Sequence, residues 1–398
     1  MPESVTAPPE LGIRHATPGL LALTIATCLA ITTEILPVGL LPAIGHTFGV
    51  RDAVTGLLVS LYAVLVALLA VPLTVVTARF PRKPLLLTTL LGYAVSNTLV
   101  AIAPTFAMVA AGRAVGGVTH ALFFSLCIGY APLCIGYAPR LVGLADVGRA
   151  LALVGGGVSA GIVVGVPLLT SVGTAVGWRG AFAVLAVLAA VLLLVVAKLL
   201  PPVSSESAPP PAGTAKGRRR LAAVVSSNAL TYTGQFTLYT FISAVLLAAG
   251  ARPAFIGPLL LMCGVCSLAG LWYVGATLDR NPRQTTVIII VVVIGALLGL
   301  GASFPALLPV VAAAAVWNGA FGGIPSIYQA GAVRAQAATP EMAGAWVNAT
   351  ANLGIAAGAA IGAGLLPTIG LAGLLWVAAA LIAISLAVTL ATGRGPTH

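Results

Sequence analysis

Twelve apolar runs, most of about 20 residues or more, dominate the sequence and are separated by short breaks with charged, proline or glycine residues. A helix needs about 20 apolar residues to cross the hydrocarbon core of a bilayer. Only 7% of the 398 residues are charged and 60% are apolar, whereas an average soluble protein has about 25% charged residues. So few charges cannot cover the surface of a soluble fold. The sequence therefore predicts an all-α membrane protein and excludes a soluble enzyme or a nucleic-acid-binding domain.

The runs also predict the domain organisation. We expect two pseudo-symmetric six-helix bundles, 19–200 and 221–392, with tails at 1–18 and 393–398. The stretch 201–220 is rich in Pro, Ser and Ala, which is typical of a flexible linker. To within several residues, the expected spans are 19–43, 54–77, 84–103, 106–132, 149–172, 180–200, 221–248, 254–278, 285–303, 305–332, 342–366 and 370–392.

The basic residues predict the orientation. If both termini lie inside, the inner segments hold fifteen Lys and Arg residues, and the outer loops hold only Arg51, Arg179 and Arg252. Cytoplasmic loops carry an excess of such residues, so we expect cytoplasmic termini in the cell (inner, cytoplasmic) membrane. This bias explains most of the net charge of +11 without a nucleic-acid partner. The run KGRRR at 216–220 is expected to anchor the topology, with contact to anionic lipid heads as the alternative.

The two halves share an internal repeat. Three landmarks of the first half recur in the same order in the second. The loop after span two recurs after span eight, 201 residues later, and a Gly-Gly pair of span four recurs in span ten, 206 residues later. A glycine ladder, meaning three glycines spaced four residues apart, lies in span five (Gly157, Gly161, Gly165) and recurs in span eleven (Gly354, Gly358, Gly362), 197 residues later. The heptad CIGYAPL at 127–133 is followed by a near-copy, CIGYAPR, at 134–140. These seven extra residues in the first half explain why the last of the three offsets is smaller than the others. We expect a tolerated duplication there, and two halves that descend from one six-helix unit.

Several motifs resemble those of a known family. The loop GATLDRNPR at 275–283 matches the pattern G-x-L-x-D-R-x-G-R-K in Gly275, Asp279, Arg280 and Arg283, and the first loop keeps Arg79, Arg82 and Lys83. Span four has Gly112-Arg113-Ala114, and span five has Gly157, Gly161, Gly165 and Pro167. On these motifs the chain is similar to the major facilitator superfamily over essentially its whole length. Residues 32–42 (TTEILPVGLLP) and 165–182 (GVPLLTSVGTAVGWRGAF) resemble its drug:proton antiporter branch, of the arabinose-efflux and actinobacterial chloramphenicol-resistance type.

The resemblance implies a non-enzymatic, proton-coupled transporter that exports a small, largely apolar compound, such as a chloramphenicol-like antibiotic, by alternating access. It implies that the matched loop residues form a conformational gate and that the span-five glycines belong to an antiporter motif. In the first loop Thr74 and Ala78 replace the Gly and Asp of the pattern. The alternatives are efflux of sugars or nucleosides, or a non-transporting receptor or scaffold. No loop exceeds about 20 residues, which disfavours the last.

Glu34 is the only acidic residue within the expected spans, and Arg113 is the only basic residue away from their inner ends; both lie ~10–14 Å below the outer surface. A charged carboxylate is costly inside a bilayer, and protonation removes that cost. We therefore expect Glu34 to carry the coupling proton. Arg113, at equal depth, could form an ion pair or share a water network with it, and His120, on nearly the same face of its helix as Arg113, could relay protons or contact the substrate. The alternatives are a carboxylate satisfied by hydroxyls such as that of Thr33, an Arg113 that binds backbone carbonyls, and a packed neutral His120.

Polar side chains in the second half predict a substrate cavity. Asn228, Tyr232, Gln235 and Tyr239 follow a 4-3-4 spacing and form one helix stripe. Such a stripe in a membrane helix faces the bundle or a watery cavity, so hydrogen bonds between helices are the alternative. The other expected cavity residues are Tyr62, Asn318, Asn348 and Asn352.

The sequence predicts no cofactor and no metal. No G-x-x-x-x-G-K-[ST] pattern occurs, so ATP does not drive the chain directly. The pair Cys263 and Cys266 has no second ligand pair. The expected partners are a small-molecule substrate, protons and the lipid bilayer, and we expect a monomer.

Overall fold

The computed structural model describes residues 13–77, 80–127, 154, 156–200, 214–338 and 340–392. The duplicated heptads beyond residue 127, most of the expected linker and Arg79 lie outside these ranges. The described residues are helical, without a strand. In the first half the elements are α1 (Ile13–Phe48), α2 (Asp52–Thr77), α3 (Arg82–Ala101), α4 (Phe106–Cys127), the π-helical η2 (Gly161–Gly165), α7 (Val166–Val176) and α8 (Trp178–Leu199).

The second half begins earlier than expected. Thr214 accepts a hydrogen bond from the backbone N–H of Gly217 and starts α9 inside the expected linker. The elements are α9 (Ala215–Tyr239), α10 (Ile242–Ala248), the short η3 (Pro253–Phe255), α11 (Ile256–Thr277), α12 (Pro282–Ser303), α13 (Leu307–Phe321), α14 (Ile324–Arg334) and α15 (Pro340–Thr392).

Within the described residues, ten helices are long and apolar enough to cross a membrane. The twelve expected spans map onto this set with two differences. Two helices meet at Gly370 inside α15, where the backbone has a φ of 64°. The expected seventh span is divided between α9 and α10, and α9 is too polar to count by composition. The fold class is therefore confirmed, and the exact number of twelve stays a prediction.

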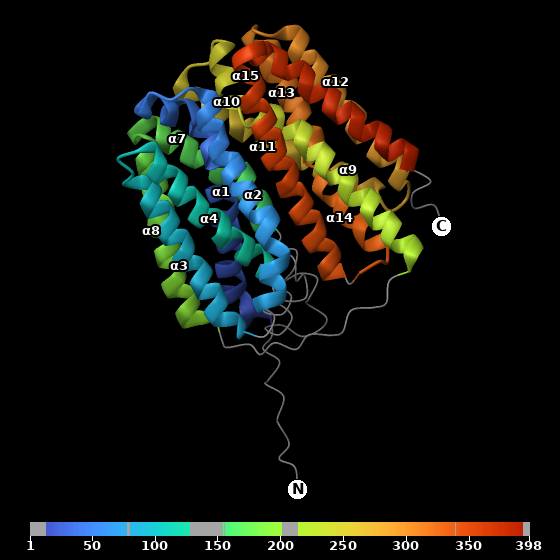
Figure 1. The fold of residues 1–398 in the computed structure, drawn as a ribbon. Helices are drawn as coiled ribbons and strands as arrows, with labels where there is room; N and C mark the ends of the chain where they lie inside the picture. Colours follow the sequence, from blue (N-terminus) through green and yellow to red (C-terminus); the bar gives the residue numbers. More distant parts are fainter. Residues whose placement is uncertain are drawn as a thin grey trace.

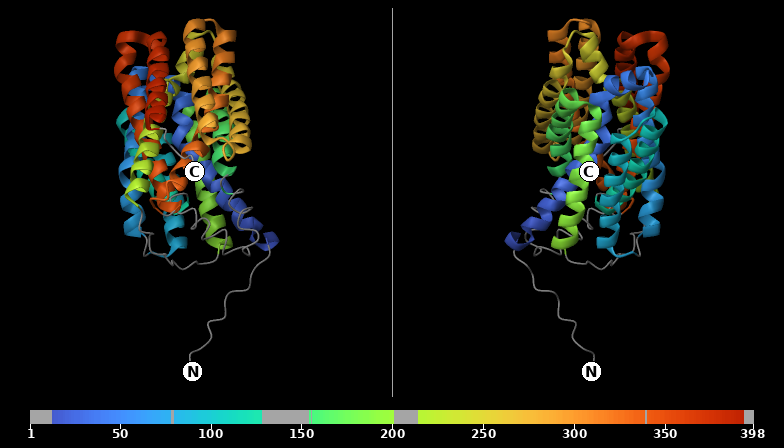
Figure 2. Two further views of the ribbon diagram at one scale, coloured as in Figure 1. Left: turned by 90° about the vertical axis from the view of Figure 1, so that its right-hand side faces the viewer. Right: turned by 90° about the vertical axis from the view of Figure 1, so that its left-hand side faces the viewer.

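Figure 1 shows two helical bundles, one from each half of the chain. Their helices run roughly along one axis in both side views (Figure 2), as a bilayer-spanning protein requires. One buried apolar cluster belongs to the first half, and a second belongs mainly to the other. The second cluster also takes in four residues of α1 and α2, namely Val38, Leu41, Val59 and Ala63.

The glycine ladders pack in equivalent ways in the two halves. In the first half they lie against the α1 backbone, so that a Cβ on Gly157 would meet the carbonyl oxygen of Thr24. In the second half they lie against α9, where a Cβ on Gly354 would meet that of Ala229. The remaining pairs are Gly161 with Cys28, Gly358 with Thr233 and Gly362 with Thr237, again at the carbonyl oxygen, and Gly165 with Thr32, at its side chain. Every α1 residue and its α9 counterpart differ by 205 in number, so the packing follows the internal repeat.

The two bundles converge at one end. Ser243 Oγ in α10 donates to the carbonyl oxygen of Val38 in α1 over 2.7 Å. These residues also differ by 205, so the contact joins equivalent positions of the two halves. Gly257 of α11 lies against Pro167 and Ser171 of α7. Figure 1 shows the bundles meeting around α1, α7, α10 and α11 and diverging towards the starts of α1 and α9.

Candidate functional site

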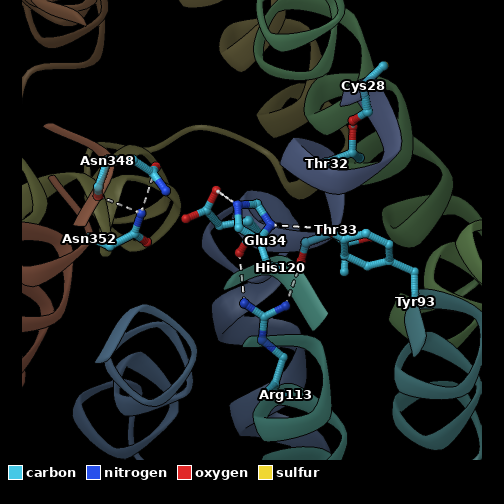
Figure 3. Close-up of polar contacts among 9 residues, drawn as sticks. All are labelled: Cys28, Thr32, Thr33, Glu34, Tyr93, Arg113, His120, Asn348 and Asn352. Atoms are coloured by element: carbon cyan, nitrogen blue, oxygen red, sulfur yellow. Dashed lines mark hydrogen bonds and ion pairs between the residues drawn. The ribbon is translucent and has the colours of Figure 1, made fainter. Parts of the chain in front are cut away.

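Glu34 lies in the middle of α1 and is enclosed by the first bundle. Its side chain is 11% exposed, and Oε2 lies 3.5 Å from Nε2 of His120 in α4 (Figure 3). Its second carboxylate oxygen, Oε1, is buried and has no hydrogen-bond partner among the residues that the structure describes. A buried carboxylate with one unsatisfied oxygen is costly in its charged form, and a proton on that oxygen relieves the cost.

Arg113 contacts the backbone of α1. Nη1 donates to the carbonyl oxygen of Thr33 over 2.5 Å, and Nη2 donates to that of Glu34 over 2.8 Å. Pro37 has no N–H, so the Thr33 carbonyl lacks its partner in the helical ladder. The guanidinium also lies over the Tyr62 ring, with Cζ 4.1 Å from the centroid. Of the two arrangements left open by the sequence, the structure shows the one in which Arg113 binds backbone carbonyls.

His120 connects Glu34 to α3. Its Nδ1 lies 3.1 Å from the hydroxyl oxygen of Tyr93, and its ring packs edge-on against Tyr62 at 5.4 Å. Asn97, one turn from Tyr93, donates to Thr33 Oγ1 over 3.2 Å. Tyr93 and Asn97 are not among the site residues predicted from the sequence, although they are two polar residues one turn apart in an apolar span, the same pattern that identified the α9 stripe.

The polar residues predicted for the substrate cavity in the second half differ in the groups that they contact. Asn228 donates to the carbonyl oxygen of Val347 over 2.8 Å and to Thr350 Oγ1 over 3.0 Å. Gln235 accepts from Trp317 Nε1 over 2.6 Å. These two residues hold α9 against α15 and α13. Asn318 donates within its own helix to the carbonyl oxygen of Ala314 over 2.9 Å. All three therefore have structural partners.

The remaining stripe residues build an aromatic wall, defined here as Tyr232, Phe236, Tyr239, Trp317 and Phe321. Tyr232 meets Phe321 at 5.4 Å and Tyr239 meets Trp317 at 6.0 Å, both edge-on. Edge-on ring pairs are favourable beyond the apolar area that they bury. By contrast, Tyr62 packs against Arg113 and His120 and not against this wall; Glu34, Tyr62, Arg113 and His120 together form the Glu34 cluster.

Asn348 and Asn352 lie one turn apart in α15. Asn352 Nδ2 bonds to the backbone oxygen of Asn348 over 3.1 Å and to its Oδ1 over 3.2 Å. The Oδ1 of Asn352 is buried and has no hydrogen-bond partner in the described part of the chain. In Figure 3 the carboxylate of Glu34 points to the side of the view on which this pair lies. Asn352 thus keeps one acceptor oxygen that no described residue uses.

The polar contacts that the structure shows for the expected gate residues join residues of the same half of the chain. Asp279, at the end of α11, forms an ion pair with Arg334 at the end of α14. Lys83 Nζ donates to the carbonyl oxygen of Ala197 in α8 over 2.8 Å. Gly275 faces open space, while Arg280 and Arg283 border a surface groove. The side chain of Arg82 is not among those described.

Comparisons with known proteins place this geometry in a family. The family model described as "Major Facilitator Superfamily" matches residues 23–344. A chloramphenicol efflux pump of Mycobacterium tuberculosis is 31% identical over 386 residues, which is 92% of this chain and 90% of that protein. A chloramphenicol resistance protein of Streptomyces lividans is 30% identical over 383 residues, covering 93% and 94%.

A solved structure shares the architecture. A bacterial homologue of the human lysosomal transporter Spinster, in an inward-facing and occupied conformation, superposes with a TM-score of 0.74 at 14% identity, over 96% of this chain and 97% of that one. At this identity the likeness shows the fold alone. Together with the matched family model, these findings show that the chain belongs to the major facilitator superfamily and is a multi-pass membrane transporter, not an enzyme.

Proposed function

We propose that this transporter exports a small, largely apolar compound, such as a chloramphenicol-like antibiotic, across the cytoplasmic membrane in exchange for protons. The observation that carries the proposal is the Glu34–His120 pair, a protonatable carboxylate buried in the bundle with one oxygen unsatisfied. A proton-driven carrier needs a group that gains and loses a proton inside the membrane. The named relatives that pump or resist chloramphenicol support the choice of substrate class.

In the proposed cycle the positive charge of Arg113 stays fixed while Glu34 changes its protonation state. Arg113 is tied to two backbone carbonyls of α1, so it does not follow the carboxylate. His120 stands 3.5 Å from the carboxylate and passes the proton on to it or receives it. Proton loss leaves a charged, buried carboxylate whose Oε1 has no hydrogen-bond donor among the described residues, which favours a different arrangement of the helices.

The aromatic wall and the Asn348–Asn352 pair would receive the substrate. Aromatic rings bury a flat apolar compound, and a few polar groups orient it. Few charges lie in the spans, which favours neutral substrates over strongly charged ones. With both termini cytoplasmic, the end at which the bundles diverge faces the cytoplasm, from which an exporter loads.

The test is a flux assay in inverted membrane vesicles. An imposed proton gradient should drive uptake of a labelled phenicol antibiotic, and a protonophore should abolish it. Sugars and nucleosides, offered in parallel, should not be taken up. Uptake of a sugar or nucleoside in place of the antibiotic would contradict the substrate class. Antibiotic uptake that ignores the proton gradient would contradict the coupling.

A further inference from the structure

A cavity lies within the second bundle, away from the Glu34 cluster. It has a volume of about 140 Å³ and is enclosed by α9, α12, α14 and α15 together with the end of α11. Every lining residue belongs to the second half of the chain, from Arg220 to Leu390. A cavity used for alternating access lies between the two halves, so this one has a different occupant.

The walls of the cavity are mostly apolar. Val224 of α9, Val287 of α12, Ile327 of α14 and Leu390 of α15 contribute side chains to it. Gly331 of α14 lies next to Val224 in the lining, so that a Cβ there would lie 3.4 Å from Val224 Cγ1. An apolar chain fits such walls better than a polar metabolite does.

The mouth of the cavity is basic. Arg220, Arg283 and Arg334 line it, and Arg283 and Arg334 also border the adjoining surface groove with Arg280. The acidic side chain in this groove is Asp279, which pairs with Arg334. Arg220 and Arg283 form no ion pair with any residue that the structure describes. The mouth therefore keeps an excess of positive charge next to an apolar interior.

We propose that this cavity binds an anionic phospholipid of the surrounding membrane. One acyl chain lies among Val224, Val287, Ile327 and Leu390, and the phosphate lies at Arg220 and Arg283. Guanidinium groups bind phosphate oxygens through charge-assisted hydrogen bonds. The bilayer supplies molecules that combine such a phosphate with an apolar chain, and the cavity combines the two matching surfaces.

The test measures binding of a fluorescent short-chain phosphatidylglycerol to the purified full-length protein in neutral detergent. Arg220→Gln and Arg283→Gln should each weaken binding about fivefold, because one basic group near an anionic lipid contributes about that factor. Arg219→Gln is the matched control, since it removes the same charge from the same helix but does not line the cavity. Equal losses in Arg219→Gln and Arg220→Gln would show diffuse attraction and overturn the proposal.

A second set of measurements separates a lipid from free phosphate. Gly331→Leu fills the apolar part, so it should weaken phosphatidylglycerol binding while all arginines remain. Ala223→Leu, from the α9 wall, should act in the same way and guards against a folding defect in one variant. Phosphatidylcholine and inorganic phosphate should compete poorly. If inorganic phosphate competes as well as the lipid, or if neither cavity-filling variant weakens lipid binding, the site is no lipid site.

Discussion

Arg113 donates to the carbonyl oxygen of Thr33, which Pro37 leaves without a helical partner. A second proline of α1 has the same consequence further along: Pro42 has no N–H for the carbonyl of Val38, and Ser243 donates to that oxygen instead. Pro37 thus frees a carbonyl oxygen of α1 that accepts a hydrogen bond from α4 within the first bundle. Pro42 frees one that accepts a hydrogen bond from α10 of the opposite bundle.

The first prediction concerns Arg113. Arg113→Ala leaves a buried carbonyl without a donor, which should destabilise the protein by about 1–3 kcal/mol. Arg113→Lys should restore part of the loss, because an ammonium is a point charge that does not form the fork that holds both carbonyls. Thermal unfolding in detergent measures the effect. Arg179→Lys is the control, since Arg179 donates to one carbonyl oxygen, that of Ala103. An Arg113→Ala protein as stable as the wild type would contradict the prediction.

The Arg113 contact also shows what sequence patterns could and could not predict here. Hydropathy predicted the membrane helices, and counting residues put Glu34 and Arg113 at equal depth. Depth says nothing of the direction in which a side chain points, so the choice between the Glu34 carboxylate and the backbone stayed open. Arg113 turned to the backbone because Pro37 had left a carbonyl free there.

The same limit explains the outcome in α9. The 4-3-4 stripe marks one helix face, but the spacing could not separate hydrogen bonds between helices from a cavity lining. Asn228 and Gln235 have partners in α15 and α13, and Tyr232 and Tyr239 join aromatic rings. Which neighbour a residue finds depends on the packing of helices distant in sequence.

The second prediction concerns the contact between the halves. Ser243→Ala removes the donor to Val38 and should weaken closure at the convergent end by about 1 kcal/mol, which shifts the conformational equilibrium about fivefold. Spin-label distances between the outer ends of α2 and α11 report that equilibrium. Thr240→Val is the matched control, because the Thr240 hydroxyl bonds within its own helix to Phe236. Equal distance distributions in Ser243→Ala and Thr240→Val would show that the contact does not hold the ends together.

The third prediction concerns the ion pair of Asp279 with Arg334. Both side chains reach the protein surface, so the pair contributes little to folding. Asp279→Asn should therefore leave expression, insertion and substrate binding unchanged. It should slow turnover if the loop acts as a gate, and Asp279→Glu should recover much of the rate. Initial rates of flux at saturating substrate decide the point, and unchanged kinetics in Asp279→Asn would remove the gate assignment.

The last prediction concerns Glu34 as the proton carrier. Glu34→Gln keeps the shape of the protonated side chain but releases no proton, so substrate binding should persist while uphill export driven by a proton gradient is lost. Facilitated movement down a substrate gradient should remain.

His120→Asn is the informative partner variant: it keeps a polar side chain beside Oε2 and should lower the rate of proton-coupled export without abolishing it. Glu34→Asp should retain part of the activity with a shifted pH optimum, because the shorter side chain moves the carboxylate away from His120 Nε2. The measurements are substrate affinity and pH-driven flux on the same preparations. Full proton-driven export by Glu34→Gln would refute the assignment of Glu34 as the proton carrier and would give that role to His120, the other titratable group of the pair.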